Sequence, residues 1–141
     1  MKIGDAIPAS VRQSDESSQL LVHFWSISCP ACKINMPYLQ ALRDGYLAHR
    51  LQTVAIHKPR GDAELDQAKV RAVADEIGVT ETLVFDNDHK ISEAFGVDAV
   101  PAYFLFDAEG RLRRHALGNF GVRMIGEAVK QLLGEATPPK T

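Results

Sequence analysis

The sequence predicts an α/β domain with a mixed central sheet and helices on both of its faces. Strand-like and helix-like segments alternate along the first part of the chain, which is typical of parallel strands joined by helices. Two neighbouring strand-like segments then form a hairpin, and a helix-like segment follows them. The 141 residues, 45% of them apolar and 24% charged, suffice for a globular core, so residues 1–141 are expected to form a single domain.

The first expected strand and helix follow a polar lead-in at residues 1–19. Residues 20–25 are a short apolar and aromatic run, as a buried central strand should be. A helix is predicted from Pro30 to about His49, because apolar residues recur there at helical spacing. These residues are Met36, Leu39, Leu42 and Tyr46.

A second strand and a second helix come next. Residues 51–56 favour a strand, and the loop at 57–61 should lie at the strand's carboxyl end, where α/β folds place their sites. A helix is expected at 62–77, with Asp62 as its N-terminal cap and Gly78 as its stop. Its apolar positions at helical spacing are Leu65, Ala68, Ala72, Val73 and Ile77.

The second half of the chain adds three strands and two helices. In order, they are a strand at 82–85, a short helix at 90–95, strands at 102–106 and 111–117, and a helix at 122–133. Turn residues separate them, with Gly96 after the short helix and Asp-Ala-Glu-Gly at 107–110 within the hairpin. Residues 135–141 are expected to be a frayed, flexible tail.

The two cysteines of the chain, Cys29 and Cys32, lie where the first strand gives way to the first helix. If that helix begins at Pro30, unpaired N–H groups and the helix dipole favour a thiolate on Cys29. Proline suits the first helical position, and Cys32 lies about one turn further along the same face. We therefore assign Cys29 as the attacking thiol and Cys32 as the resolving thiol, with Pro30 and Ala31 between them.

Other uses of this cysteine pair are disfavoured. A structural zinc site generally needs four ligands, and the sequence has neither a second cysteine pair nor histidines at zinc-finger spacing. A c-type haem needs a histidine where Lys33 stands. A disulfide that closes so short a loop would stabilise little, so the pair is expected to be redox-active and the site free of metal.

Composition and motifs exclude several partners. A net charge of −2 without blocks of like charge disfavours nucleic acid and anionic membranes. No glycine-rich nucleotide fingerprint is present, so the expected cofactor is none beyond the reversible Cys29–Cys32 disulfide. Neither a signal peptide nor a membrane-spanning segment is evident, which predicts a cytoplasmic protein, or an extracytoplasmic one if a leader was removed.

These features together resemble the thioredoxin fold. They are Phe-Trp-x-x-x-Cys-x-x-Cys-Lys after a buried strand, Val-Pro before the hairpin, and a final helix. The extra helix between the second and third strands looks like the insertion of the TlpA/ResA-like branch. The segments at 23–29, 54–60 and 100–103 look closest to YkuV-like bacterial thiol-disulfide oxidoreductases, and the likeness covers roughly residues 20–134.

The resemblance implies a site and a reaction. Pro101 should be the family's cis-proline, packed against the dithiol, with the backbone of Val100 free to pair with an extended substrate. Trp25 should shape and shield the site. The implied reaction is reduction of a disulfide in a protein substrate by a monomer that another protein resupplies with electrons.

Two departures from the family concern the proton of Cys32. Thioredoxins usually carry a buried aspartate where this chain has His23, and ResA-like proteins carry a glutamate where it has Asn35. Within a buried strand, His23 is expected to be a neutral, hydrogen-bonded core residue. The candidate proton acceptors are His23, a water molecule, and Glu64 or Asp66 of the inserted helix.

Two rival functions remain. One is a thiol peroxidase of the same fold, which would need a sulfenic acid stage and usually a threonine and an arginine around the reactive thiol. Neither stands beside Cys29 in the sequence. The other is a non-catalytic binding module, which would have no need to retain Cys29, Cys32 and Pro101 together. The residue before Cys29 is Ser28, where many relatives carry tryptophan, so a less aromatic substrate surface is expected.

Overall fold

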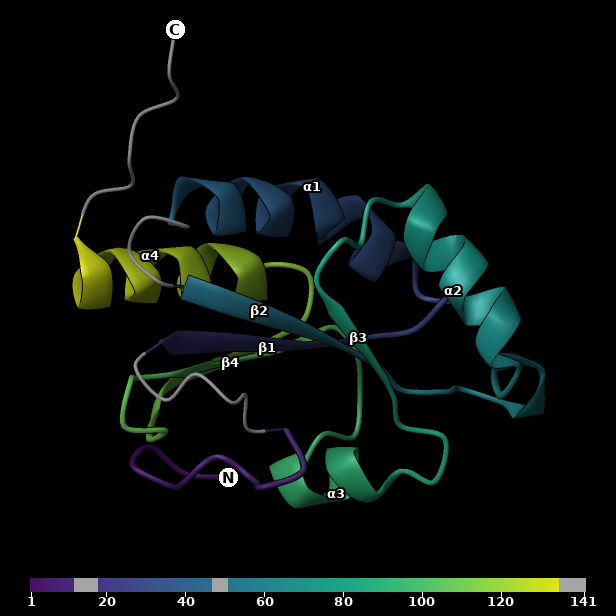
Figure 1. The fold of residues 1–141 in the computed structure, drawn as a ribbon, viewed down its shortest axis with the longest axis horizontal. Helices are drawn as coiled ribbons and strands as arrows, with labels where there is room; N and C mark the ends of the chain where they lie inside the picture. The colour runs from purple at the N-terminus through teal and green to yellow at the C-terminus, as the bar shows by residue number, and fades with distance from the viewer. Residues whose placement is uncertain (12–17, 47–50, 135–141) are drawn as a thin grey trace, which may run out of the picture.

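The computed structural model describes residues 1–11, 18–46 and 51–134, and these form a five-stranded mixed sheet (Figure 1). The spatial order of the strands is β3-β2-β1-β4-β5. β1 pairs in parallel with β2, as β2 does with β3, whereas β4 is antiparallel to both β1 and β5. The strands are β1 (Gln19–Trp25), β2 (Leu51–His57), β3 (Thr82–Phe85), β4 (Ala102–Phe106) and β5 (Leu112–Leu117).

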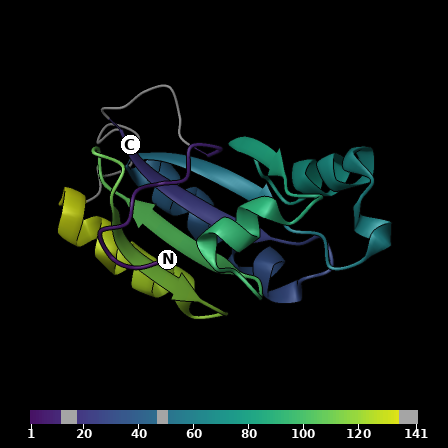
Figure 2. The same ribbon diagram turned by 90° about the horizontal axis from the view of Figure 1, so that it is seen from below.

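Helices lie on both faces of this sheet, as predicted. They are α1 (Pro30–Gly45), α2 (Gln67–Glu76), α3 (Lys90–Phe95) and α4 (Gly121–Leu133). α1 and α4 cover one face, and α3 lies on the other, in front of the sheet in Figure 2. Alternate residues of β1 point to opposite faces, so Leu21 and Trp25 join the core beneath α1 and α4, whereas Val22 and Phe24 join the core beneath α3.

The ends of the chain and of α1 differ from the expected boundaries or lie outside the described residues. α1 ends at Gly45, with Tyr46 as its cap, rather than at His49, which falls among residues 47–50 outside the described ranges. The lead-in forms one isolated β-bridge, between Ala6 and Arg111. The flexible tail predicted at 135–141 also lies outside the described residues.

The predicted start of the helix at 62–77 is wrong, because the α-helix begins five residues later, at Gln67. A short 3-10 turn, η2 (Asp62–Glu64), comes first, and α2 begins only after Asp66. The Asp66 carboxylate accepts the N–H groups of Ala68 at 3.0 Å and Lys69 at 3.3 Å, so Asp66 rather than Asp62 is the cap. Both aspartates are good capping residues, and the helix begins at the one whose carboxylate reaches the free N–H groups.

The later start also changes which side chains of α2 are buried. Val70 and Ala74 are buried, and Val73 and Ile77 pack against them as predicted. Leu65 stands before the helix and is 41% exposed. Two more residues predicted to face inward, Ala68 and Ala72, are exposed on the outer side of α2.

The strand register brings three separate segments to one edge of the sheet. In the parallel pair β1 and β2, Trp25 lies opposite His57, so the residues that follow the two strands meet. In the antiparallel pair β1 and β4, Phe24 lies opposite Ala102, so the residues before β4 reach the same edge. The cysteine pair, the loop after β2 and Pro101 are therefore neighbours.

Candidate active site

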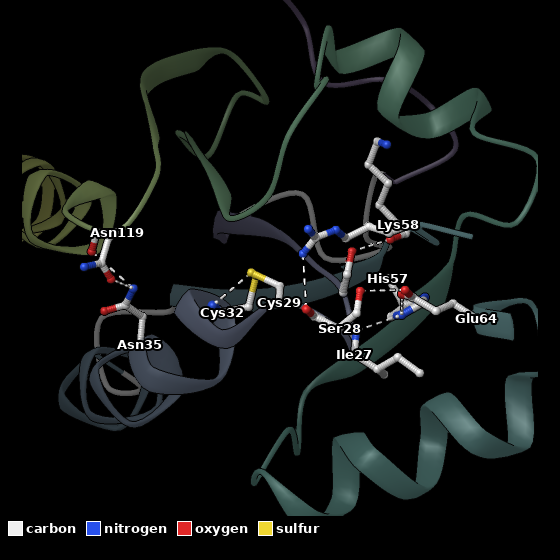
Figure 3. The surroundings of a disulfide bond; sticks show 11 residues. Ile27, Ser28, Cys29, Cys32, Asn35, His57, Lys58, Glu64 and Asn119 are labelled. Atoms are coloured by element: carbon white, nitrogen blue, oxygen red, sulfur yellow. Dashed lines mark hydrogen bonds and ion pairs between the residues drawn. A yellow bond between two sulfur atoms is a disulfide. The ribbon is translucent and has the colours of Figure 1, made fainter. Parts of the chain in front are cut away.

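Cys29 and Cys32 form a disulfide at the start of α1 (Figure 3). Cys29 is the N-terminal cap of the helix, with extended backbone, and Pro30 follows in the first turn. The Cys29 sulfur accepts the backbone N–H of Cys32 at 3.1 Å. In the reduced protein this N–H and the helix dipole favour a negative charge on Cys29, as the sequence predicts. Both cysteines are buried in the oxidised protein, with 3% and 2% of their surface exposed.

The Val100–Pro101 peptide bond is cis, as the family resemblance implies. The Pro101 carbonyl accepts the N–H of Gly118 at 2.9 Å, which ties this segment to the end of β5. Among the described residues, no backbone hydrogen bond involves Val100. The backbone of Val100 is therefore free to pair with an incoming extended chain.

Trp25 is buried behind the disulfide. It belongs to the same apolar cluster as both cysteines, and 1% of its surface is exposed. Its ring meets the ring of His57 edge-on, with centroids 5.1 Å apart. Trp25 therefore shapes the inner wall of the site rather than its surface.

His57 is a site residue that the sequence placed only in a loop. It ends β2, is fully buried, and its Nε2 accepts the backbone N–H of Ile27 at 3.2 Å. Because Nε2 accepts, the ring proton of neutral His57 resides on Nδ1, which has no partner among the described residues. Burial lowers the pKa of His57, and the nearby Glu64 carboxylate only partly opposes this effect. His57 is therefore neutral at physiological pH.

Glu64 reaches the same turn from η2. Its Oε2 accepts the hydroxyl proton of Ser28 at 2.6 Å, and its Oε1 lies 3.5 Å from Nε2 of His57. Ser28 immediately precedes Cys29, so a buried carboxylate is coupled to the turn that carries the dithiol. Figure 3 shows Glu64 and His57 together on the Ser28 side of the disulfide.

Asn35 holds the opposite side of the disulfide. Its side-chain Nδ2 donates to the backbone carbonyl of Asn119 at 3.1 Å and to the Asn119 side-chain oxygen at 3.0 Å. This contact between the buried Asn35 and the exposed Asn119 ties α1 to the segment between β5 and α4 (Figure 3). The residue that stands where ResA-like proteins carry a glutamate is therefore a structural link in this chain.

The other candidate proton acceptors have partners elsewhere. His23 is buried, and its ring Nε2 lies 3.0 Å from Oε1 of Glu81, so the predicted hydrogen-bonded core histidine is confirmed. Burial alone would raise the pKa of Glu81, but the hydrogen bond and charge of His23, with Arg43, bring it below its ordinary value. Asp66 is exposed and caps α2. Of the candidate carboxylates, Glu64 is the one that hydrogen-bonds to the turn carrying the cysteines, through the Ser28 hydroxyl.

A sequence signal for His57 did exist. Residues that follow two adjacent parallel strands meet at one edge of the sheet, and His57 stands at the end of the second strand. The sequence identified that edge but gave His57 no role there.

None of the helices within the described ranges combines the length and apolar character needed to cross a bilayer.

Comparisons with known proteins agree on one family. The Redoxin family model matches residues 4–132. Thiol-disulfide oxidoreductase YkuV of Bacillus subtilis (strain 168) is 41% identical over 115 residues, which cover 82% of this chain and 77% of YkuV. Thiol-disulfide oxidoreductase ResA of Geobacillus thermodenitrificans (strain NG80-2) is 28% identical over 84% of this chain, which spans only 63% of ResA.

Solved structures give the same result. The solution structure of a thioredoxin-like protein in the oxidised form matches with a TM-score of 0.82 and 34% identity, over 97% of this chain and 100% of the other. A putative thiol:disulfide interchange protein DsbE from Chlorobium tepidum matches with a TM-score of 0.76 over 93% of this chain and 94% of the other. At 22% identity, the second match supports the thioredoxin fold alone.

Proposed function

Because the chain belongs to the redoxin family, with named thiol-disulfide oxidoreductases among its relatives, we propose that Cys29 and Cys32 reduce disulfides of other proteins. The chain is a thiol-disulfide oxidoreductase that works by dithiol–disulfide exchange. The observation that carries the proposed site is the Cys29 sulfur at the start of α1, on the sheet edge that also holds cis-Pro101.

The reaction begins with attack by the Cys29 thiolate on one sulfur of the substrate disulfide. The substrate S–S bond breaks, its other sulfur leaves as a thiolate and takes up a proton, and a mixed disulfide joins Cys29 to the substrate. Cys32 then loses its proton and attacks the Cys29 sulfur. The second substrate sulfur leaves and is protonated, so two electrons have passed from the dithiol to the substrate, and the Cys29–Cys32 disulfide remains.

The surrounding residues have distinct roles in this scheme. The backbone N–H of Cys32 stabilises the Cys29 sulfur, and Pro30 and Ala31 hold the two cysteines one helical turn apart. Val100 offers its free backbone to the substrate chain. These groups come from one chain, so the scheme needs only a monomer, and it uses no cofactor beyond the disulfide.

We propose that Glu64 accepts the proton that Cys32 loses during resolution of the mixed disulfide. The hydrogen bond from Ser28 places this carboxylate in the network of the cysteine turn, whereas His23 is held by Glu81 and Asp66 by the first turn of α2. In this proposal, solvent carries the proton from Cys32 to Glu64. General base catalysis of this kind usually contributes 10²–10⁴-fold, so the assignment is open to kinetic test.

The oxidised pair must be reduced again by a donor protein. The comparisons do not support the cytoplasmic location expected from the sequence, and one structural relative, at 18% identity, is described as a secreted disulfide oxidoreductase. We therefore extend the proposal to an extracytoplasmic location. There the donor must act outside the cytosol, where disulfides otherwise persist.

Insulin reduction tests the proposed function. We expect the wild-type protein to accelerate reduction of insulin by dithiothreitol, Cys29→Ser to be inactive, and Cys32→Ser to accumulate a mixed disulfide with the substrate. Full activity of Cys29→Ser would contradict the mechanism and favour a binding module.

Peroxide consumption belongs in the same experiment. No arginine stands beside Cys29 in the sequence, but the fold brings Arg60 to the carbonyl of Ser28, the preceding residue, at 3.3 Å. A thiol peroxidase would consume hydrogen peroxide through Cys29 with dithiothreitol as reductant. We expect insulin reduction to dominate, and rapid peroxide turnover without insulin reduction would replace the proposal with the peroxidase.

A further inference from the structure

Lys58 is fixed beside the dithiol by its backbone. It directly follows β2, its N–H donates to the carbonyl of Trp25 at 2.8 Å, and its own carbonyl accepts the hydroxyl proton of Ser26. Among the described residues, its ammonium group has no hydrogen bond or ion pair, and its side chain reaches away from the disulfide in Figure 3. The ammonium group is therefore presented to solvent from an anchored position close to Cys29.

Arg60 is the second cation at this place. Its Nη1 donates to the carbonyl of Ser28, the residue before Cys29, at 3.3 Å. Between the two cations stands the buried Pro59, which has a fixed backbone φ and limits the freedom of the loop. Among the described residues, the other N–H groups of the Arg60 guanidinium have no acceptor, so they can bind an anion.

Two cavities meet at these cations. The larger, of about 610 Å³, is bounded by the loop after β2 and the turn before α3. The smaller, of about 200 Å³, runs from the same cations to the segment before cis-Pro101. Lys58 and Arg60 line both cavities, and Val100 lines the smaller one. An extended substrate chain at Val100 therefore has the two cations as its next neighbours.

Neither cation is neutralised by the part of the protein that the structure describes. Within the described ranges, no carboxylate lies within ion-pair distance of Lys58 or Arg60. Asp62 on the wall of the larger cavity and Asp98 on that of the smaller are both exposed and make no ion pair with them. His89 also lines the larger cavity and adds positive charge when protonated.

We propose that Lys58 and Arg60 bind an acidic side chain of the substrate protein, close to the cysteine that Cys29 attacks. The inference rests on the proposed function, because it specifies which protein disulfides the site takes. A peptide carboxylate is favoured over a free anion because the smaller cavity connects the cations to the unpaired backbone of Val100. Arg60 can hold the carboxylate through two parallel hydrogen bonds, and Lys58 adds a point charge.

The test uses three synthetic peptides that differ only beside one cysteine of an internal disulfide, where they carry Glu, Gln or Lys. Second-order rate constants for their reduction by the reduced protein are measured at low ionic strength. We expect the Glu peptide to react about 3–10 times faster than the Lys peptide, as two exposed ion pairs allow. The preference should shrink as salt shortens the Debye length from about 30 Å at 0.01 M to about 8 Å at 0.15 M.

Variants separate the binding pocket from the chemistry. We expect a Lys58→Gln, Arg60→Gln double variant to lose the Glu preference, and Arg60→Glu to invert it, while Arg114→Gln on the exposed face of β5 keeps it. The rate ratio between peptides is the readout, because a general effect on the Cys29 thiolate cancels in it. As a control, the Cys29–Cys32 disulfide of each oxidised variant is reduced with dithiothreitol, an uncharged reagent. A wild-type rate shows that the variant retains a reactive cysteine pair.

Each outcome has one meaning. Equal rates for the three peptides, or a Glu preference that survives in the double variant, would overturn the pocket and leave the proposed function standing. If millimolar phosphate abolishes the preference for the Glu peptide but leaves reduction of the Gln peptide unchanged, this result would support anion binding by Lys58 and Arg60. Failure of the wild-type protein to reduce any of the three peptides would overturn the proposed function itself, and this inference with it.

Discussion

Nε2 of His57 accepts the backbone N–H of Ile27 at 3.2 Å, so a buried ring on β2 fixes the turn that carries Cys29. The contact needs a neutral imidazole, because a proton on Nε2 would oppose the Ile27 donor. A protonated Nε2 would instead favour Glu64, whose Oε1 is 3.5 Å away. The protonation state of His57 is therefore coupled to the geometry of the active-site turn.

This coupling predicts a pH dependence of stability. Burial lowers the pKa of His57 below its ordinary value of 6.5, so on acidification the unfolded chain takes up this proton before the folded one. The stabilisation is complete above about pH 6.5 and is lost as the pH falls through the lowered, folded-state pKa. Between pH 7 and pH 5, we expect the free energy of unfolding in urea to fall more steeply for the wild type than for His57→Gln.

A matched control for this measurement is His115→Gln, which removes an exposed histidine on β5. Its pH profile should follow that of the wild type. If His57→Gln and the wild type lose stability in parallel over this pH range, the assigned neutral state of His57 is wrong. Changes near the ordinary pKa of Glu81, 4.5, lie below the range and do not interfere.

The second prediction concerns Glu64 as proton acceptor. Glu64→Gln keeps an acceptor for the Ser28 hydroxyl but removes the charge, so we expect resolution of the mixed disulfide to slow by about 10²-fold or more near pH 7, with little change in stability. The rate is followed by release of a chromophoric thiol from a mixed disulfide on Cys29. Asp66→Asn, on the exposed cap of α2, should resolve at the wild-type rate. Unchanged kinetics in Glu64→Gln would remove Glu64 from the mechanism.

The third prediction concerns Asn35. Asn35→Ala removes both hydrogen bonds to Asn119, so we expect a loss of about 1–2 kcal/mol in the free energy of unfolding. Asn35→Asp should cost more, because its carboxylate would face two oxygen atoms of Asn119 without a donor between them. Urea unfolding of both variants checks this order. Equal free energies of unfolding for Asn35→Asp and the wild type would show that the contact between Asn35 and Asn119 does not contribute to stability.

The fourth prediction compares two glycines of α4. A Cβ on Gly121 would lie 2.9 Å from Cδ2 of Tyr103, so we expect Gly121→Ala to destabilise the protein by about 1–3 kcal/mol. A Cβ on Gly126 would meet no atom within 4 Å, so Gly126→Ala should stabilise it by about 0.5–1 kcal/mol through helix propensity. Thermal unfolding measures both. Similar effects of the two substitutions would contradict the packing of α4 on the sheet.

Local sequence patterns predicted the parts of the site that depend on local chemistry. The cysteine pair with Pro30 indicated a helix start, and the structure places Cys29 as its cap. Val100–Pro101 before a hairpin indicated the cis-proline through the family resemblance. In both cases the residues that matter are adjacent in sequence, so no knowledge of the packing was needed.

The contacts of Glu64 and His57 depend on choices that the sequence does not settle. Asp62 and Asp66 are equally good caps, and only the choice of Asp66 leaves Glu64 in a 3-10 turn that faces Ser28. The role of His57 depends on the register of β1 against β2, which places it opposite Trp25. A shift by one residue would turn its ring to the other face of the sheet.

The redox equilibrium of Cys29–Cys32 is the decisive measurement for a protein-disulfide reductase. The single tryptophan, Trp25, packs in the same cluster as both cysteines, so its fluorescence should report the transition in a dithiothreitol redox buffer. For a disulfide reductase, we expect one reversible two-electron transition with a midpoint near or below about −270 mV. A midpoint of about −180 to −120 mV, typical of isomerases and oxidants, or the absence of any transition, would contradict it.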